Sequence, residues 1–173
     1  MIKCTECGSS QEEGLLFCSE CGGFLLVETG KITAVLPFSE FANRPPPPPL
    51  AKDTLAPAAV APKIALVVPS SRRRFKLTVQ DEVQIGRASS ELVPEVDLSD
   101  DDGAEKGVSR LHAKIHAVQE GLVLIDLNST NGTLLNNYRL PPHEPYPLQS
   151  GDEIRFGDLL VHIFLSDSGS GTN

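Results

Sequence analysis

The stretch that decides the fold runs from residue 108 to residue 133 and reads VSRLHAKIHAVQEGLVLIDLNSTNGT. Its first part alternates, and one face of an extended chain there would carry Leu111, Ala113, Ile115 and Ala117. Successive side chains of a strand point to opposite faces, so this alternation predicts a strand with one buried face. An apolar run at 122–127 predicts a second strand, and the Asn131-Gly132 pair that follows favours a tight turn.

The residues on either side of this stretch also form short apolar segments separated by turn residues. We expect further strands near residues 64–68, 75–79, 83–85, 132–135, 152–156 and 159–165. Many short strands with regular turn signals indicate a β-sandwich or barrel. No segment has the apolar periodicity of an amphipathic helix, so the expected fold class is all-β.

Composition divides the chain into four parts. Residues 1–27 hold every cysteine, residues 28–62 are a Pro/Ala-rich linker, residues 63–166 carry the expected sandwich, and residues 167–173 form a tail expected to be disordered. The unbroken proline run at 45–49 favours an extended spacer, which we expect to hold the N-terminal part at a distance from the sandwich. Such a run can also recruit an SH3-like partner.

The four cysteines of the chain form two C-x-x-C pairs, each followed by glycine: Cys4, Cys7, Cys18 and Cys21. Four thiolates at this spacing predict one Zn²⁺ ion in a small zinc ribbon, and a Cys₄ set leaves no open position for catalysis. Two disulfides or a redox pair are the alternatives. They fit less well because we identify no signal peptide and no βαβ pattern.

The charge balance restricts the classes of partner. The formal net charge is −8, which argues against binding nucleic acid or an anionic membrane through global charge. Within the first 27 residues Lys3 is the only basic residue, against four glutamates. Zinc ribbons that bind nucleic acid normally need basic residues. With no apolar run long enough to span a membrane, we expect a cytoplasmic protein.

Three motifs stand at the ends of expected strands. They are Ile85-Gly86-Arg87, the VSRLHA of residues 108–113 and the STNGT of residues 129–133. Loops at strand ends cluster at one edge of a sandwich, so these would bring together Arg87, Ser109, Arg110 and Asn131. Arginine suits phosphate, a hydroxyl adds a donor, and an asparagine amide can hold a peptide backbone. The set predicts binding of a phosphorylated peptide without cleavage.

With these motifs in this order, the sequence resembles the forkhead-associated (FHA) domains. The matching stretches are IGR at 85–87, VSRLHA at 108–113, LNSTNGT at 127–133 and LQSGDEIRFG at 148–157. The resemblance covers roughly residues 64–165. It implies an eleven-stranded β-sandwich that binds phosphothreonine peptides, a class of phospho-motif reader that depends on arginine.

The resemblance also implies roles for individual residues. It implies that Arg87 and Ser109 contact the phosphate, that Thr130 and Asn131 line the peptide groove, and that Arg110 is a secondary contact. It assigns structural roles to three further residues of the motifs: Gly86, His112 and Gly132. The acidic stretch at 95–105 departs from the family pattern as an insertion.

Other interpretations of the same residues are weaker. Ser109 and His112 suggest a nucleophile and its base, but no glycine elbow surrounds the serine. The DDDG at 100–103 lacks the register of a calcium-binding loop and is expected to be solvated. The RRR at 72–74 is expected to be a solvated turn or a positive rim beside the phosphate site.

The sequence therefore predicts a non-catalytic adaptor in Ser/Thr kinase signalling whose partner is a phosphothreonine-containing protein. The chain's own N-terminal segment is an alternative occupant, through phosphorylation of Thr29, Thr33 or Thr54. Two other functions remain open: a nucleic-acid-associated regulator, and an assembly or scaffold protein that uses the zinc ribbon.

Overall fold

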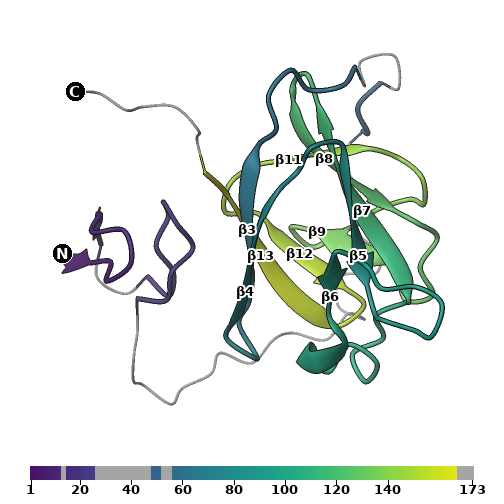
Figure 1. Cartoon of the computed structure of the whole chain (residues 1–173), viewed down its shortest axis with the longest axis horizontal. Coiled ribbons are helices and arrows are strands. Elements are labelled where there is room, and N and C mark those ends of the chain that lie inside the picture. The colour runs from purple at the N-terminus through teal and green to yellow at the C-terminus, as the bar shows by residue number, and fades with distance from the viewer. Residues whose placement is uncertain (13–14, 26–47, 52–55, 167–173) are drawn as a thin grey trace.

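The computed structural model describes residues 1–12, 15–25, 48–51 and 56–166. Eleven strands form the two sheets of a sandwich. Two short strands belong to the cysteine-containing N-terminal module, residues 1–12 and 15–25 (Figure 1). The predicted all-β class and the eleven-stranded sandwich are confirmed. Within the described ranges, no helix has both the length and the apolar character needed to cross a membrane.

The first sheet has six strands in the order β10-β9-β12-β13-β3-β4. Its strands are β3 (Lys63–Val68), β4 (Arg73–Thr78), β9 (Thr133–Leu135), β10 (Tyr138–Arg139), β12 (Glu153–Phe156) and β13 (Leu159–Ser166). The second has five in the order β11-β8-β7-β5-β6. Its strands are β5 (Glu82–Gly86), β6 (Val96–Asp97), β7 (Leu111–Val118), β8 (Gly121–Asp126) and β11 (Tyr146–Leu148).

The main core lies between the two sheets. Alternate residues of β13 point into it, namely Leu159, Val161 and Ile163, and those of β7 meet them from the other sheet. Burying these branched aliphatic side chains supplies the main favourable term of folding. The alternation noted in the sequence therefore does place one face of each long strand in the core.

Strand β7 departs from the predicted alternation at its first two residues. Leu111 is 38% exposed, whereas His112 is fully buried and packs edge-on against Phe156. The pairing of β5 with β7 shifts at this point, because Ile85 pairs with Ala113 but Gly86 pairs with Leu111. The resulting β-bulge turns the imidazole inward and redirects the chain that precedes the strand.

Some elements were not predicted from the sequence. Strands β6, β10 and β11 have only two or three residues each, too few to show an alternating pattern. The acidic stretch also contains a short 3-10 helix, η3 (Ser99–Asp101). It is therefore folded against the sandwich and is not simply a solvated loop.

The cysteine-containing module has little regular structure. Its strands β1 (Ile2–Lys3) and β2 (Ser10–Gln11) pair antiparallel, and Phe17 forms an isolated bridge with Phe24. Of the apolar run at 24–27, Phe24 contributes only this bridge, and residues 26–27 lie outside the described ranges.

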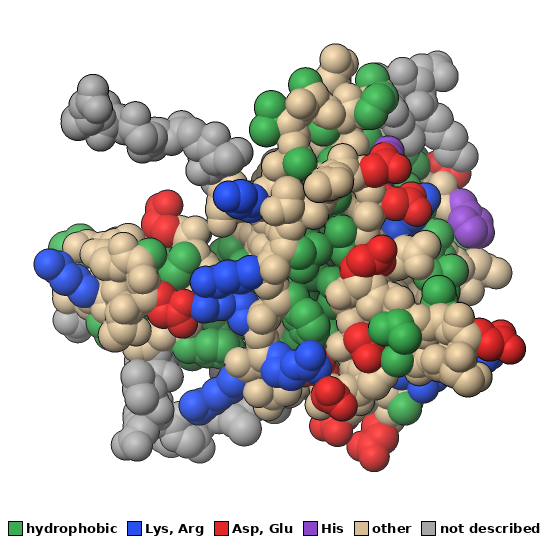
Figure 2. Space-filling view, in the orientation of Figure 1, with side chains coloured by type: hydrophobic (Ala, Val, Ile, Leu, Met, Phe, Trp, Pro, Cys, Tyr) green, Lys and Arg blue, Asp and Glu red, His purple; other side chains and the backbone are tan. Residues whose placement is uncertain are grey.

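The module packs on the outer face of the six-stranded sheet, contrary to the expectation that the linker holds it at a distance. Phe17 stacks near Phe164 and His162, at centroid distances of 6.2 and 5.0 Å. Glu6 forms ion pairs with Arg74 and Lys76 of β4. Figure 2 shows Lys and Arg side chains gathered where the module meets the sandwich. Apolar contacts with β13 and ion pairs with β4 together hold the module on this sheet.

Part of the linker also lies on the sandwich, against the other sheet. The N–H of Leu50 donates to the carbonyl of Pro145 at 2.9 Å, and that of Gln119 donates to Ala56 at 2.8 Å. Pro57 forms an isolated bridge with Val118 of β7. The threonines proposed for regulation in cis, and the tail at 167–173, lie outside the described residues.

The aromatic contact between module and sandwich can be tested with Phe17→Ala. We expect a loss of about 1–3 kcal/mol in the free energy of unfolding, because a half-buried aromatic ring is removed. NMR signals of Val67 and Phe164 should shift. The control is Leu16→Ala, whose side chain is 51% exposed. Unchanged signals at Val67 and Phe164 would show that the module does not pack there.

A second test uses pH. Burial lowers the pKa of His112 from its ordinary value of 6.5. As the pH falls through about 6.5, the unfolded chain takes up a proton before the folded chain does, so stability should decrease. One histidine contributes a slope of up to about 1.4 kcal/mol per pH unit.

Burial also lowers the pKa of His162, which adds to the slope in the same direction. Chemical denaturation of the wild type and of His112→Asn between about pH 5 and pH 7 separates the two contributions. The variant should show the shallower decline. Equal slopes would mean that His112 is not buried in its neutral form.

Candidate functional site

The candidate site lies where strand ends meet at one edge of the sandwich. Arg87 directly follows β5, and Arg110 directly precedes β7, the antiparallel neighbour of β5. The two backbones approach closely at Gly86, where an added Cβ would overlap the Arg110 carbonyl oxygen. Only glycine fits there, and this close approach brings Arg87 beside the loop that contains Ser109.

The backbone and side chain of Arg87 are both fixed by that loop. Its N–H donates to the carbonyl of Arg110 at 3.1 Å, and its side-chain Nε donates to the carbonyl of Val108. Nε is only one of the nitrogens that carry donor hydrogens in a guanidinium group. The hydrogen bond from Nε fixes the plane of the guanidinium group. It therefore orients the two Nη atoms without using any of their hydrogens.

Ser109 and His112 make contacts that exclude the nucleophile-and-base interpretation. The Nδ1 atom of His112 accepts the backbone N–H of Ser109 at 2.9 Å, and its Nε2 faces the carbonyl of Gly132 at 3.0 Å. Nδ1 must therefore be unprotonated and Nε2 must donate. With both ring nitrogens bonded to backbone groups, the imidazole has no nitrogen left to take a proton from the Ser109 hydroxyl.

The hydroxyl of Ser109 instead links two loops. Its Oγ accepts the backbone N–H of Thr130 at 3.1 Å. Since this bond uses the oxygen as acceptor, the hydroxyl hydrogen remains a donor. Thr130 itself is exposed, and its contact with Ser109 is made by its backbone.

Asn131 is oriented by the same loop. Its Nδ2 donates to the carbonyl of Gly107 at 2.9 Å, so its Oδ1 keeps its capacity to accept. Gly107 has a φ of +81°, and an added Cβ there would overlap Asn131 Nδ2. Any other residue at 107 would push the amide away, which makes this glycine part of the site although the sequence analysis did not identify it.

The two remaining residues of the predicted set contribute chiefly through their backbones. The carbonyl of Arg110 accepts from Arg87, and its side chain is exposed. The carbonyl of Gly132 accepts from His112. Beside Asn131 lies an open hollow of about 200 Å³ lined by Thr130, Asn131, Arg139, Gly157 and Asp158.

Asp126 is a further contributor that the sequence analysis missed. Its Oδ1 accepts the hydroxyls of Ser129 and Thr133, each at 2.6 Å, and its Oδ2 accepts the backbone N–H of Ser129 at 3.2 Å. The carboxylate is buried and shapes the loop that carries Thr130 and Asn131. An aspartate three residues before a serine in a turn is a recognisable local signal for this arrangement.

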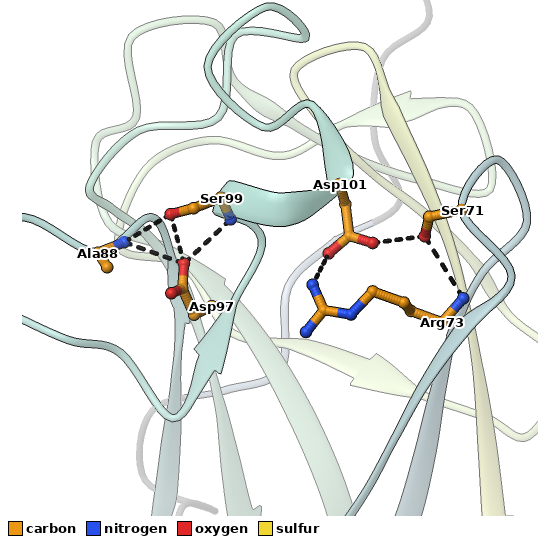
Figure 3. Close-up of polar contacts among 6 residues, drawn as sticks. All are labelled: Ser71, Arg73, Ala88, Asp97, Ser99 and Asp101. Carbon is orange, nitrogen blue, oxygen red and sulfur yellow. Dashed lines mark hydrogen bonds and ion pairs between the residues drawn. The ribbon is translucent and has the colours of Figure 1, made fainter.

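The arginine triplet is not the solvated turn expected from the sequence, because Arg73 and Arg74 belong to β4, and these two side chains do not form the alternative positive rim. Arg73 is ion-paired with Asp101, and Arg74 with Glu6 of the module (Figure 3 shows the first pair). Asp101 is buried and bonded to protein groups, so the DDDG stretch does not present it as a ligand for calcium. Only Arg72 of the three is exposed.

The four cysteines form a cluster suited to a metal ion. Their Sγ atoms all lie within 4.8 Å of one another, with Cys4–Cys21 at 3.6 Å and Cys7–Cys18 at 3.5 Å, and none is in a disulfide. A tetrahedron of sulfurs around Zn²⁺ has edges of about 3.8 Å. Two similar turns position the cysteines. The N–H of Gly8 donates to the carbonyl of Cys4, and the N–H of Gly22 donates to the carbonyl of Cys18.

The surroundings of the thiols differ across the cluster. Hydrogen bonds from Ser9 lower the pKa of Cys7 to about 6, whereas burial raises the pKa of Cys21 to about 12. Burial therefore disfavours a fully ionised set of thiolates unless a cation neutralises it. The donor set, its spacing and its burial all fit one soft divalent cation.

The comparisons with known proteins agree with this architecture. Residues 83–157 match the model of the FHA domain. Protein FraH of a Nostoc species is 37% identical over 84 residues, which are 47% of this chain and 29% of FraH. The human nuclear inhibitor of protein phosphatase 1 is 40% identical over 63 residues, 35% of this chain and 18% of that protein. The chain thus spans less than a third of either relative.

Solved structures show the same fold. The solution structure of an FHA domain of Arabidopsis thaliana has a TM-score of 0.51 and 26% identity, and the alignment covers 68% of this chain and 97% of that domain. Mycobacterium tuberculosis EmbR, solved in complex with a low-affinity phosphopeptide, has a TM-score of 0.50 and 27% identity over 69% of this chain and 29% of EmbR. The β-sandwich of this protein is an FHA domain, and residues 83–157 are the part that the family model matches.

Proposed function

We propose that the strand-end loops bind a phosphothreonine peptide and that the protein acts as a non-catalytic adaptor in Ser/Thr kinase signalling. One observation carries the proposal: each of three side chains is fixed through one atom and keeps another for a ligand. Arg87 is held at Nε, Ser109 at its oxygen lone pair and Asn131 at Nδ2. Such preorganisation reduces the cost of ordering side chains when a ligand binds.

The three groups have complementary roles toward a phosphopeptide. The paired Nη donors of Arg87 match two oxygens of a phosphate, and the Ser109 hydroxyl donates to a third. Asn131 Oδ1 accepts an N–H of the peptide backbone. The partly buried position of Arg87 strengthens its interaction with a doubly charged phosphate relative to a fully exposed arginine.

The relatives support a binding role for the site. EmbR was solved with a phosphopeptide, and the 29% of EmbR that aligns with this chain has a similar fold. The proposed ligand of this chain is a phosphothreonine-containing protein. A Ser/Thr kinase that phosphorylates this protein is the second proposed partner. Because both His112 nitrogens are bonded to backbone groups, His112 cannot serve Ser109 as the general base of a serine hydrolase.

We further propose that the cysteine cluster holds one structural Zn²⁺ ion. Cys4, Cys7, Cys18 and Cys21 would be its ligands, and the ion would supply the folding free energy that so small a module lacks. Glu6 of this module binds Arg74 and Lys76 of the sandwich. The module's acidic surface therefore fits protein docking better than contact with nucleic acid.

The phosphopeptide proposal can be tested by isothermal titration calorimetry with a phosphothreonine peptide selected from a library. Arg87→Ala should weaken binding by about 2–4 kcal/mol, because a charge-assisted pair is lost. Ser109→Ala should cost about 1–2 kcal/mol, the value of one bond to a charged group. Lys63→Gln, which removes one exposed positive charge at the start of β3, is the charge-matched control.

Two outcomes would contradict the proposal. One is equal affinity of the wild type and Arg87→Ala for the phosphopeptide. The other is equal affinity of the wild type for the phosphorylated and unphosphorylated forms of the same peptide.

Metal removal tests the second proposal. Elemental analysis of the purified protein should give one zinc per chain, and chelation should unfold the module while the sandwich stays folded. NMR should then show loss of structure in residues 1–12 and 15–25. The signals of Val67 and Phe164 should also change, because Phe17 and Phe24 pack against them in the docked state. A chain without zinc whose module keeps its structure would contradict the assignment.

A further inference from the structure

The acidic stretch that departs from the family pattern contains an aspartate directed into the protein. Asp101 is only 2% exposed. Its Oδ2 pairs with Arg73 Nη1 at 2.6 Å, and its Oδ1 accepts the hydroxyl of Ser71 (Figure 3). Arg73 also lies over the ring of Phe75, at 4.6 Å from its centroid. Both oxygens of the carboxylate are thus held by the β3–β4 hairpin.

A second carboxylate of the same stretch holds the residue next to Arg87. The Oδ1 of Asp97 accepts the backbone N–H of Ala88 and that of Ser99, each at 3.0 Å, and the Ser99 hydroxyl at 2.6 Å (Figure 3). Burial acts to raise the pKa of Asp97, but these hydrogen bonds outweigh it and keep the pKa below its ordinary value. The charged form is therefore the one that the fold uses.

The turn at 98–103 connects Asp101 to the proposed phosphate site. The N–H of Gly103 donates to Leu98 at 3.1 Å, and the N–H of Val108 donates to Gly103 at 2.7 Å. The carbonyl of Val108 is in turn the acceptor for Arg87 Nε. A continuous series of bonds therefore runs from the turn to the guanidinium group.

The same turn also packs directly against Arg87. A Cβ added to Gly103 would lie 3.2 Å from Arg87 Cγ. The turn thus forms a wall beside the methylene groups of the arginine side chain. A displacement of the turn would change both the wall and the acceptor that orient the guanidinium.

We propose that Asp101, held by Arg73 and Ser71, is a positioning residue that presets Arg87 for phosphate. The inference rests on the proposed phosphopeptide function and deepens it. The carboxylate of Asp101 is fully buried, whereas 38% of the Arg73 side chain is exposed. Such a pair contributes little net stability, but removing the carboxylate releases the segment that it fixed. The Asp101–Arg73 pair therefore holds the inserted segment in the one arrangement that orients Arg87.

The primary test compares Asp101→Asn with Asp100→Asn. The two variants make the same change of charge at adjacent residues, but Asp100 is exposed. Asp101→Asn should weaken binding of the phosphothreonine peptide by about three- to tenfold, the range expected from re-ordering one long side chain. Asp100→Asn should bind like the wild type.

A double-mutant cycle distinguishes an effect of Asp101 through Arg87 from a general structural role of Asp101. If Asp101 acts through Arg87, then Asp101→Asn should cause no further loss of affinity in an Arg87→Ala background. Additive losses would overturn the proposal. If Asp101→Asn does not fold, Ser71→Ala removes a single hydrogen bond to the same carboxylate and should give a smaller loss that also vanishes in the Arg87→Ala background.

A readout without ligand distinguishes failure of this inference from failure of the proposed function. In the free protein, Asp101→Asn should shift the NMR signal of the Arg87 Nε–H and speed hydrogen exchange of the Val108 amide, and Asp100→Asn should do neither. These effects in a protein that binds no phosphothreonine peptide would refute the function and retain the positioning role. Wild-type signals in Asp101→Asn would refute the positioning role.

Discussion

The buried imidazole of His112 is the constraint on which the geometry of the site depends. It accepts a hydrogen bond from the backbone of Ser109 and donates one to the backbone of Gly132, so one rigid ring spans the two loops that carry Ser109 and Asn131. The bulge in β7 places the ring there, and Phe156 packs against it. Because both contacts involve backbone groups, they fix the course of the two loops as well as individual side chains.

Arg87 has a separate support. It follows β5, its Nε donates to the carbonyl of Val108, and the turn at 98–103, whose Asp101 pairs with Arg73, lies beside its side chain. The site is therefore assembled from two parts: a histidine that joins the hydroxyl and amide loops, and an ion pair that holds the segment beside the cation. Both lie behind the residues that would contact a ligand.

Two described parts of the N-terminal half lie on opposite outer faces of the sandwich. The module packs on Val67 and Phe164 of one sheet, whereas Leu50 packs near Val123 and Val118 of the other. This explains why apolar side chains point outward from both sheets, where a free sandwich would expose them to water. The Pro-rich segment thus separates two docked parts of the chain and does not simply space two independent domains.

Much of this was predictable from local sequence patterns. The alternation through Ala113 and Ile115 predicted a strand with one buried face. The order of the motifs predicted the sandwich and the loops at its edge. The very short strands were not predicted, because two or three residues are too few to show an alternation of apolar and polar side chains. The Asp101–Arg73 pair and the contact of Phe17 with Phe164 join residues far apart in the chain, and no local pattern encodes them.

The most direct test of the central claim is an NMR titration of the amide-labelled protein with a phosphothreonine peptide. The account predicts that the largest shifts fall in the three edge loops, at residues 86–88, 107–110 and 129–132, and that the unphosphorylated peptide leaves these signals unchanged. Shifts centred on the cysteine module, or the same shifts with the unphosphorylated peptide, would contradict it.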